Sequence, residues 1–246
     1  SDQRTEQEAT GLYIYHCDSD DSLHPNLLSR MVEVAKKEDA DIVMCNAEFI
    51  YANKKETYHS TNWTKDKVKS LNDFVNSPWT VVWNMLSKKE LYDNYEISSP
   101  ENISFCEDFH LSFRLCYVAK KIVHIDDTLY YYNRTNISSI SNTKNQKRIE
   151  SEIQTYLEII GFLKDRNDFS SYEQSMCWRM LRAKNDWLYD ENNYSKYHST
   201  FPYSHKYILS CPYYNPKFRL MAYALTHHLP IVAKVMMRMW KKMNRM

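Results

Sequence analysis

The fold is decided by a short segment near the start of the chain, GLYIYHCDSDD at residues 11–21. Its first half carries Leu, Ile and aromatic side chains, which favour a buried β-strand. This strand leads directly into Asp18, Asp20 and Asp21, at the point where strands of an α/β sheet end and ligands commonly bind. Carboxylates this close repel one another unless solvent, a cation or a basic side chain compensates their charge. The segment therefore predicts a strand that ends in an acidic site.

Two interpretations of the acidic cluster follow from the residues. Asp18 and Asp20 form an Asp-x-Asp pair, which can hold a hard divalent cation whose remaining positions are filled by water and substrate phosphate. The alternative is structural. In that case one of residues 20–22 caps the helix that Pro25 opens, and Asp18 is solvated at the strand end.

The residues after this cluster alternate between helix and strand patterns. Apolar residues at helical spacing predict a helix over 25–39 that packs on a sheet. β-Branched and aromatic residues predict strands over 41–51, 56–60, 80–86, 121–126 and 129–133. This order predicts an α/β layer. Glu107 and Asp108 open another helical pattern, where the helix dipole and the free N–H groups of the first turn favour carboxylates.

Composition limits the classes of function. The net charge of +1 over 246 residues provides no field that would attract nucleic acid. Twenty Tyr and two Gly indicate helices and aromatic packing, and there is no GxGxxG or P-loop pattern. The six cysteines form no CxxC pair, which favours reduced thiols in the core and a cytoplasmic location.

Residues 143–246 predict helices. The last of them, over 229–245, has apolar residues on one side and Lys and Arg on another, which is typical of a basic amphipathic helix. One interpretation is contact with a membrane surface, and the other is docking on the protein's own core. No apolar run is long enough to span a bilayer, so any membrane contact is expected from the surface.

Residues 9 to 142 resemble the family-2 glycosyltransferases. The segment at 11–28 is similar to the part of that family in which a strand ends in Asp-Ser-Asp-Asp and continues into a helix. Further motifs follow in the family's order: Ala40-Asp41-Ile42-Val43, Val82-Trp83-Asn84, Glu107-Asp108 and Tyr130-Tyr131-Tyr132-Asn133-Arg134. The ordered set, rather than any single motif, carries the resemblance.

The resemblance implies a fold and a domain organisation. Residues 11–142 are expected to form an α/β unit, part of a GT-A-like mixed sheet with flanking helices, followed by an all-α extension over 143–246. Residues 1–10 carry few apolar side chains and are expected to be a frayed or disordered lead-in. In the family a βαβ unit that holds the base and ribose of the donor precedes this point, and we expect the sequence to lack it.

The resemblance also implies a reaction: inverting transfer of a sugar from a nucleotide-diphospho-sugar to a hydroxyl of a glycan or lipid-linked glycan, with Mn²⁺ or Mg²⁺. The metal ligands would be Asp20 and Asp18, of which Asp18 also contacts the donor. Asp108 would be the general base, supported by Glu107, because a positioned carboxylate can take the proton of a sugar hydroxyl. At this place the family often has Gly where this chain has Asn102 and Cys106.

Four more residues receive roles from the resemblance. Arg134 and Ser139 would bind the donor diphosphate, for which an Arg fork is well suited. The alternative for Arg134 is a surface residue that closes a loop. Trp83 and Asn84 would lie on the acceptor side, although core packing is the alternative for Trp83. The family usually has Lys two residues after the Trp, where this chain has Met85.

Two other functions stay open. In the first, the chain is a non-catalytic remnant that binds a partner or a membrane through its C-terminal helices. In the second, it is a metal-dependent phosphohydrolase that uses the same carboxylates. If the glycosyltransferase interpretation holds, we expect the protein to act in the cytoplasm. If its acceptor is lipid-linked, we expect it at the inner face of the membrane.

Overall fold

The computed structural model describes residues 6, 8–99, 103, 105–135, 146–227 and 229–243. The chain divides into two compact units, Ser1–Ser151 and Glu152–Met246. The division falls inside helix α6 (Gln146–Asp165), a little after the predicted boundary at residue 143.

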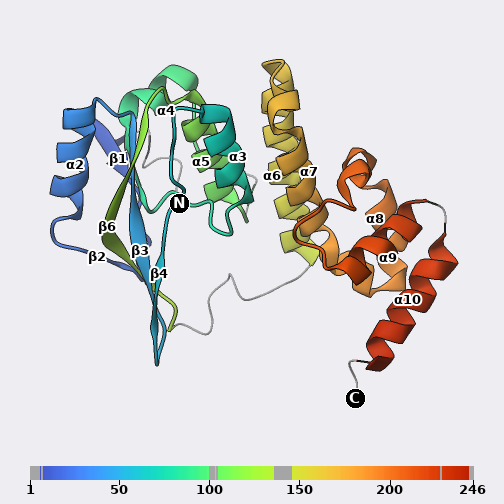
Figure 1. Cartoon of the computed structure of the whole chain (residues 1–246). Helices are drawn as coiled ribbons and strands as arrows, with labels where there is room; N and C mark the ends of the chain where they lie inside the picture. Colours follow the sequence, from blue (N-terminus) through green and yellow to red (C-terminus); the bar gives the residue numbers. More distant parts are fainter. Residues whose placement is uncertain are drawn as a thin grey trace. The chain divides into compact units, whose positions relative to one another are not determined.

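The first unit is a mixed sheet with helices on both faces (Figure 1). The strand order is β1-β5-β3-β6-β2, with β4 beside β3, and only β3 and β6 are parallel among the described strands. The strands are β1 (Tyr13–Tyr15), β2 (Ser22–Leu23), β3 (Ile42–Ile50), β4 (Lys55–Tyr58), β5 (Met85–Lys88) and β6 (Ile122–Asn133). This mixed sheet confirms the predicted α/β fold class.

Helix α2 covers one face of the sheet, and α3 and α5 lie on the other (Figure 1). Leu27, Met31 and Ala35 recur one helical turn apart and are buried against Val43 and Cys45 of β3. Leu27 and Met31, the large side chains of this set, each contribute about 1.5–3 kcal/mol by leaving water. The helices of this unit are α2 (Leu27–Glu38), α3 (Lys67–Asn76), α4 (Lys89–Tyr95) and α5 (Glu107–Val118).

Strand β6 is continuous, and the prediction of two short strands around residues 126–128 was wrong. The β3–β6 register pairs Met44 with His124 and Asn46 with Thr128, so β6 bulges between them. The Asn46 side chain compensates for the interrupted ladder, because its Nδ2 donates to the Asp126 carbonyl at 3.1 Å and its Oδ1 lies 2.9 Å from His124 Nε2. The polar residues 126–128, which the sequence pattern predicts as a turn, therefore form a β-bulge that the buried Asn46 amide stabilises.

One other expectation needs correction. The predicted strand over 80–86 is displaced to β5, because residues 82–84 bend and turn before it. In the predicted lead-in, Glu6 is buried, and its carboxylate accepts hydrogen bonds from Ser99 N at 3.0 Å and Ser99 Oγ at 2.7 Å.

The second unit is helical, as predicted. Its core holds large aromatic side chains, including Tyr156, Trp187, Tyr197 and Tyr214. Among them lies the buried ammonium of Lys184, which donates to the carbonyls of Tyr197 and Thr200. Besides α6, the helices are α7 (Phe169–Ala183), α8 (Tyr194–Ser199), α9 (Pro216–Thr226) and α10 (Pro230–Met243), with 3-10 turns at Asn185–Tyr189, Glu191–Asn193 and Pro202–Tyr207. All six cysteines of the chain are free thiols.

Candidate functional site

The acidic turn at residues 18–21 connects β1 to β2 and is held by the end of β6. The Tyr130 hydroxyl accepts from Asp18 N at 3.3 Å and donates to Asp21 Oδ2 at 2.5 Å. Asn133 N donates to Asp21 Oδ1 at 2.7 Å, and Asn133 Nδ2 donates to the Asp20 carbonyl at 3.2 Å. Both oxygens of Asp21 are thus engaged with protein donors. This carboxylate fixes the turn and is not available to a ligand.

The other two carboxylates of the turn are exposed. Within residues 8–99 and 105–135, no hydrogen bond or ion pair engages the carboxylate of Asp18 or Asp20. Partial desolvation, and then the charges of Asp21 and Asp20, raise the pKa of Asp18. Two exposed oxygen donors with uncompensated negative charge fit a hard divalent cation that also binds water and phosphate.

In the part of the chain that the structure describes, no group of three His, Cys, Asp or Glu side chains is arranged as a metal cage. Asp18 and Asp20 alone would supply the protein ligands. Such a donor set would leave most coordination positions of a bound cation to water and phosphate.

The second acidic pair lies in the first turn of α5. Asp108 is half-buried, and desolvation, followed by the charges of Glu107 and Asp18, raises its pKa to about 7. Glu107 in turn contributes to the raised pKa of Asp18. The helix dipole favours the charged carboxylate, so burial and like charges outweigh it here. The structure therefore brings Asp18, Glu107 and Asp108 into one electrostatic environment.

The residue that precedes this pair has an unusual backbone. Cys106 has φ 66° and is the N-terminal boundary residue of α5, in the left-handed region that Gly adopts at least cost. The family resemblance places Gly here, and the backbone shows why a Gly suits the position. Asn102, the other departure, lies outside the described residues.

Arg134 follows β6 directly and lies near the turn. Its backbone N donates to the Ile50 carbonyl at 2.8 Å, and its guanidinium lies 5.6 Å from the ring centroids of both Trp79 and Tyr132. Such stacking holds a guanidinium in a defined orientation. Since Asp18 influences the pKa of Tyr132 as well, Arg134 belongs to the same edge of the sheet. Ser139, the other predicted diphosphate ligand, lies outside the described residues.

The two residues predicted on the acceptor side are both in the core. Trp83 is 2% exposed and stacks on Tyr130 at 4.5 Å between centroids. Asn84 is buried, and its Nδ2 donates to the Cys45 carbonyl at 3.2 Å. In this structure neither side chain is accessible to an acceptor, which agrees with the packing alternative for Trp83.

Sequence reasoning missed the residues that position the turn, Tyr130 and Asn133. Both stand in the Tyr-Tyr-Tyr-Asn motif, but the motif does not reveal that they contact a turn more than a hundred positions earlier. Burial and the adjacent Asp21 carboxylate raise the pKa of Tyr130, so its phenol keeps the proton that it donates.

We expect Tyr130→Phe to lower the free energy of unfolding by about 1–3 kcal/mol, because it leaves Asp21 Oδ2 and Asp18 N without their shared partner. Chemical denaturation measures this loss. Tyr131→Phe is the matched control, since Tyr131 pairs with Ser22 on β2 and its side chain points to the opposite face of β6. Equal losses in the two variants would contradict the positioning role.

Known proteins resemble the chain in sequence and in fold. Residues 5–107 match the model of Glycosyl transferase family 2. The chain is 27% identical over 179 residues to the putative glycosyltransferase EpsH of Bacillus subtilis (strain 168), covering 69% of this chain and 51% of that protein. It is 22% identical over 200 residues to the uncharacterized glycosyltransferase YibD of Escherichia coli (strain K12), covering 71% of this chain and 56% of that protein. The chain thus spans about half the length of the curated relatives it matches.

The fold has a solved counterpart. The crystal structure of S. aureus TarS 1-349 in complex with UDP-GlcNAc superimposes with a TM-score of 0.61 at 13% identity, covering 98% of this chain and 70% of that one. At this identity the likeness concerns the fold alone. The chain is thus similar to glycosyltransferase family 2 over residues 5–107 and to named glycosyltransferases over most of its length, and its fold is GT-A-like.

Proposed function

We propose that this chain takes part in inverting transfer of a sugar from a nucleotide-diphospho-sugar to a hydroxyl of a glycan or lipid-linked glycan. One observation carries the proposal: Asp18 of the turn lies close enough to the acidic pair of α5, about ninety residues later in the sequence, for its charge to raise the pKa of Asp108 and for Glu107 to raise the pKa of Asp18. A site that binds a cation next to a general base needs this juxtaposition.

Each residue has a role that its surroundings support. Asp108 accepts the proton of the acceptor hydroxyl, and its pKa of about 7 leaves a substantial fraction ionised at neutral pH. Glu107 raises that pKa and thereby makes Asp108 a stronger base. Arg134, oriented by two aromatic rings, offers its N–H groups to the diphosphate that departs.

The turn supplies the remaining component. Asp18 and Asp20 would hold Mn²⁺ or Mg²⁺, which when bound compensates the negative charge that develops on the departing diphosphate. Asp21, Tyr130 and Asn133 hold the turn in place before any ligand arrives. The position of the turn is therefore set by contacts within the protein rather than by ligand binding.

The donor class has support from outside the chain. The solved TarS structure contains UDP-GlcNAc, and we extend from it the use of a nucleotide-diphospho-sugar. A lipid-linked acceptor would place the reaction in the cytoplasm, at the inner face of the membrane. The free thiols of the chain are compatible with that compartment.

Calorimetry with Mn²⁺ and a panel of nucleoside diphosphates tests the proposal. We expect heat of binding only when metal and nucleotide are present together, and a loss of affinity of more than about tenfold in Asp20→Asn, because a metal ligand is removed. Asp126→Asn is the matched control, since its carboxylate is 98% exposed in the bulge of β6. If no nucleotide of the panel gives heat of binding, with or without metal, the result would instead favour a non-catalytic binding module. Nucleotide release from the donor without an acceptor would favour a phosphohydrolase.

A further inference from the structure

The positive charge of the chain is concentrated at its C-terminal end. Residues 192–246 contain nine Lys or Arg and no Asp or Glu, although the whole chain has a net charge of only +1. Local charge of one sign attracts a surface of the opposite sign, even where the net charge is small.

Helix α10 packs through one side and leaves an aliphatic strip exposed beside it. Ala233 and Met237 are buried, and the Trp240 ring contacts Phe218 and Tyr189 edge to face at 5.6 and 5.4 Å. The strip consists of exposed apolar side chains at helical spacing: Ile231 (74% exposed), Val232, Val235 and Met239 (60% exposed). Leu229 extends it just before the helix. A contiguous apolar surface of this kind marks an interaction site.

The flank of the same helix is cationic. Lys234 and Arg238 lie 3.5 and 3.2 Å from Glu191 and are therefore compensated within the protein. Lys241 and Lys242 are exposed, and no ion pair of residues 146–227 or 229–242 engages them. Aliphatic residues beside uncompensated lysines are typical of a helix that lies in the interface of an anionic bilayer.

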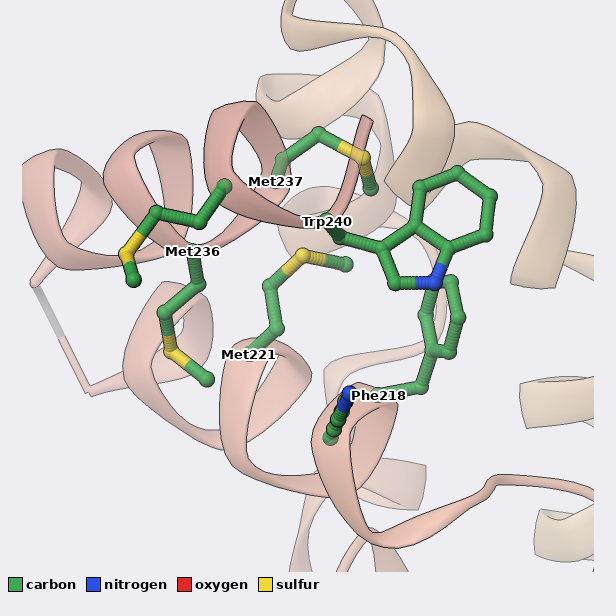
Figure 2. Close-up of a pocket in the computed structure, with 7 residues that line it drawn as sticks. Phe218, Met221, Met236, Met237 and Trp240 are labelled. Atoms are coloured by element: carbon green, nitrogen blue, oxygen red, sulfur yellow. The ribbon is translucent and has the colours of Figure 1, made fainter. Parts of the chain in front are cut away.

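A pocket of about 180 Å³ lies between α9 and α10. It is lined by Lys217, Phe218, Met221, Met236, Met237, Met239 and Trp240. Figure 2 shows the Met221, Met236 and Phe218 side chains directed into the same space between the two helices. Unbranched Met side chains adapt to flexible apolar ligands, and Lys217 places a cation at this otherwise apolar site.

We infer that α9 and α10 form a docking surface for an anionic phospholipid membrane. The strip on α10 inserts among the acyl chains, the pocket accommodates part of one chain, and Lys217, Lys241 and Lys242 contact the headgroups. The exposed residues of the strip are aliphatic, which suits acyl chains better than the stacked bases of a nucleic acid. None of the described helices has the length and apolar character to cross a bilayer, so the contact is interfacial. The inference rests on charge and exposure and is independent of sugar transfer.

Vesicle flotation of the full chain tests the inference. We expect binding to phosphatidylcholine vesicles that contain phosphatidylglycerol, little binding to phosphatidylcholine alone, and weaker binding as salt is raised. Lys241→Gln and Lys242→Gln should each weaken binding by about fivefold. Val235→Ser combined with Met239→Ser should weaken it by more than about tenfold, while Val68→Ser, an exposed apolar position of α3, should not.

Other outcomes would overturn the inference. Absence of binding to anionic vesicles by the folded wild-type chain, verified by circular dichroism, would do so. Tighter binding to a soluble polyanion such as heparin, unaffected by the Val235 and Met239 substitutions, would assign the surface to a polyanion. Self-association abolished by those substitutions would assign the strip to a second copy of the chain.

Discussion

Replacing Asp108 with Asn is expected to lower sugar transfer by about 10²–10⁴-fold, the range typical of a general base. Asn has nearly the same shape but cannot accept the proton of the acceptor hydroxyl. Metal-dependent nucleotide binding should persist, because Asp18 and Asp20 remain. Steady-state transfer and calorimetry on one preparation separate the two effects. Near-wild-type turnover would contradict the assignment.

The same substitution should stabilise the fold at high pH. The folded pKa of Asp108, about 7, lies above its ordinary value of 3.8. Between these values the folded state binds more protons than the unfolded state, so stability present at low pH is lost as pH rises through the window. Each tenfold difference between the acid dissociation constants of the folded and unfolded states lowers the free energy of unfolding at high pH by about 1.4 kcal/mol. Asn carries no charge and therefore avoids this loss.

Denaturant melts at pH 4 and pH 8 measure this linkage. Asp108→Asn should be more stable than wild type at pH 8 and closer to it at pH 4. The control Asp165→Asn, at an exposed position near the end of α6, should show no such divergence. A loss of stability at pH 8 in Asp108→Asn would show that the carboxylate is charge-compensated in the fold.

Trp83→Ala is expected to lower the free energy of unfolding by about 3–5 kcal/mol, the usual cost of truncating a buried Trp. Trp83 stacks on Tyr130 and Tyr132 and meets Phe49 edge to face, so its loss opens a cavity below the residues that hold the turn. Denaturant unfolding measures the cost, with Tyr95→Ala, an exposed aromatic position of α4, as the control.

Trp83→Phe distinguishes packing from acceptor contact. A smaller ring in the same place should recover part of the stability and leave transfer nearly unchanged. A variant of wild-type stability with strongly reduced transfer would instead restore the acceptor role that the family resemblance implies.

Local patterns predicted much of the fold. Apolar and aromatic residues leading into an acidic cluster predicted β1 and its turn, and helical spacing over residues 25–39 predicted α2, which the structure confirms as Leu27–Glu38. Glu107 and Asp108 do open α5. These features depend on neighbouring residues, so the sequence displays them directly.

Features that depend on distant residues could not be predicted in the same way. The local sequence does not show that the three aspartates of the turn have different roles. Asp21 differs because its carboxylate accepts hydrogen bonds from Tyr130 and Asn133, which are adjacent to it only in the folded protein. Strand β2 has two residues and no pattern of its own, since it exists only through pairing with β6. Residues 126–128 are polar and therefore resemble a turn. The bulge that they form could not be predicted, because the Asn46 side chain that stabilises it is remote in sequence.

The proposed function requires the acidic turn and the start of α5 to share one ligand site. Anomalous diffraction from crystals of the chain grown with Mn²⁺ and a nucleoside diphosphate would locate the metal. We expect a manganese peak in contact with a carboxylate oxygen of Asp18 or Asp20, on the side of the turn that faces Asp108, and bridged to phosphate. Manganese and nucleotide bound together elsewhere, with the turn empty, would refute the shared site.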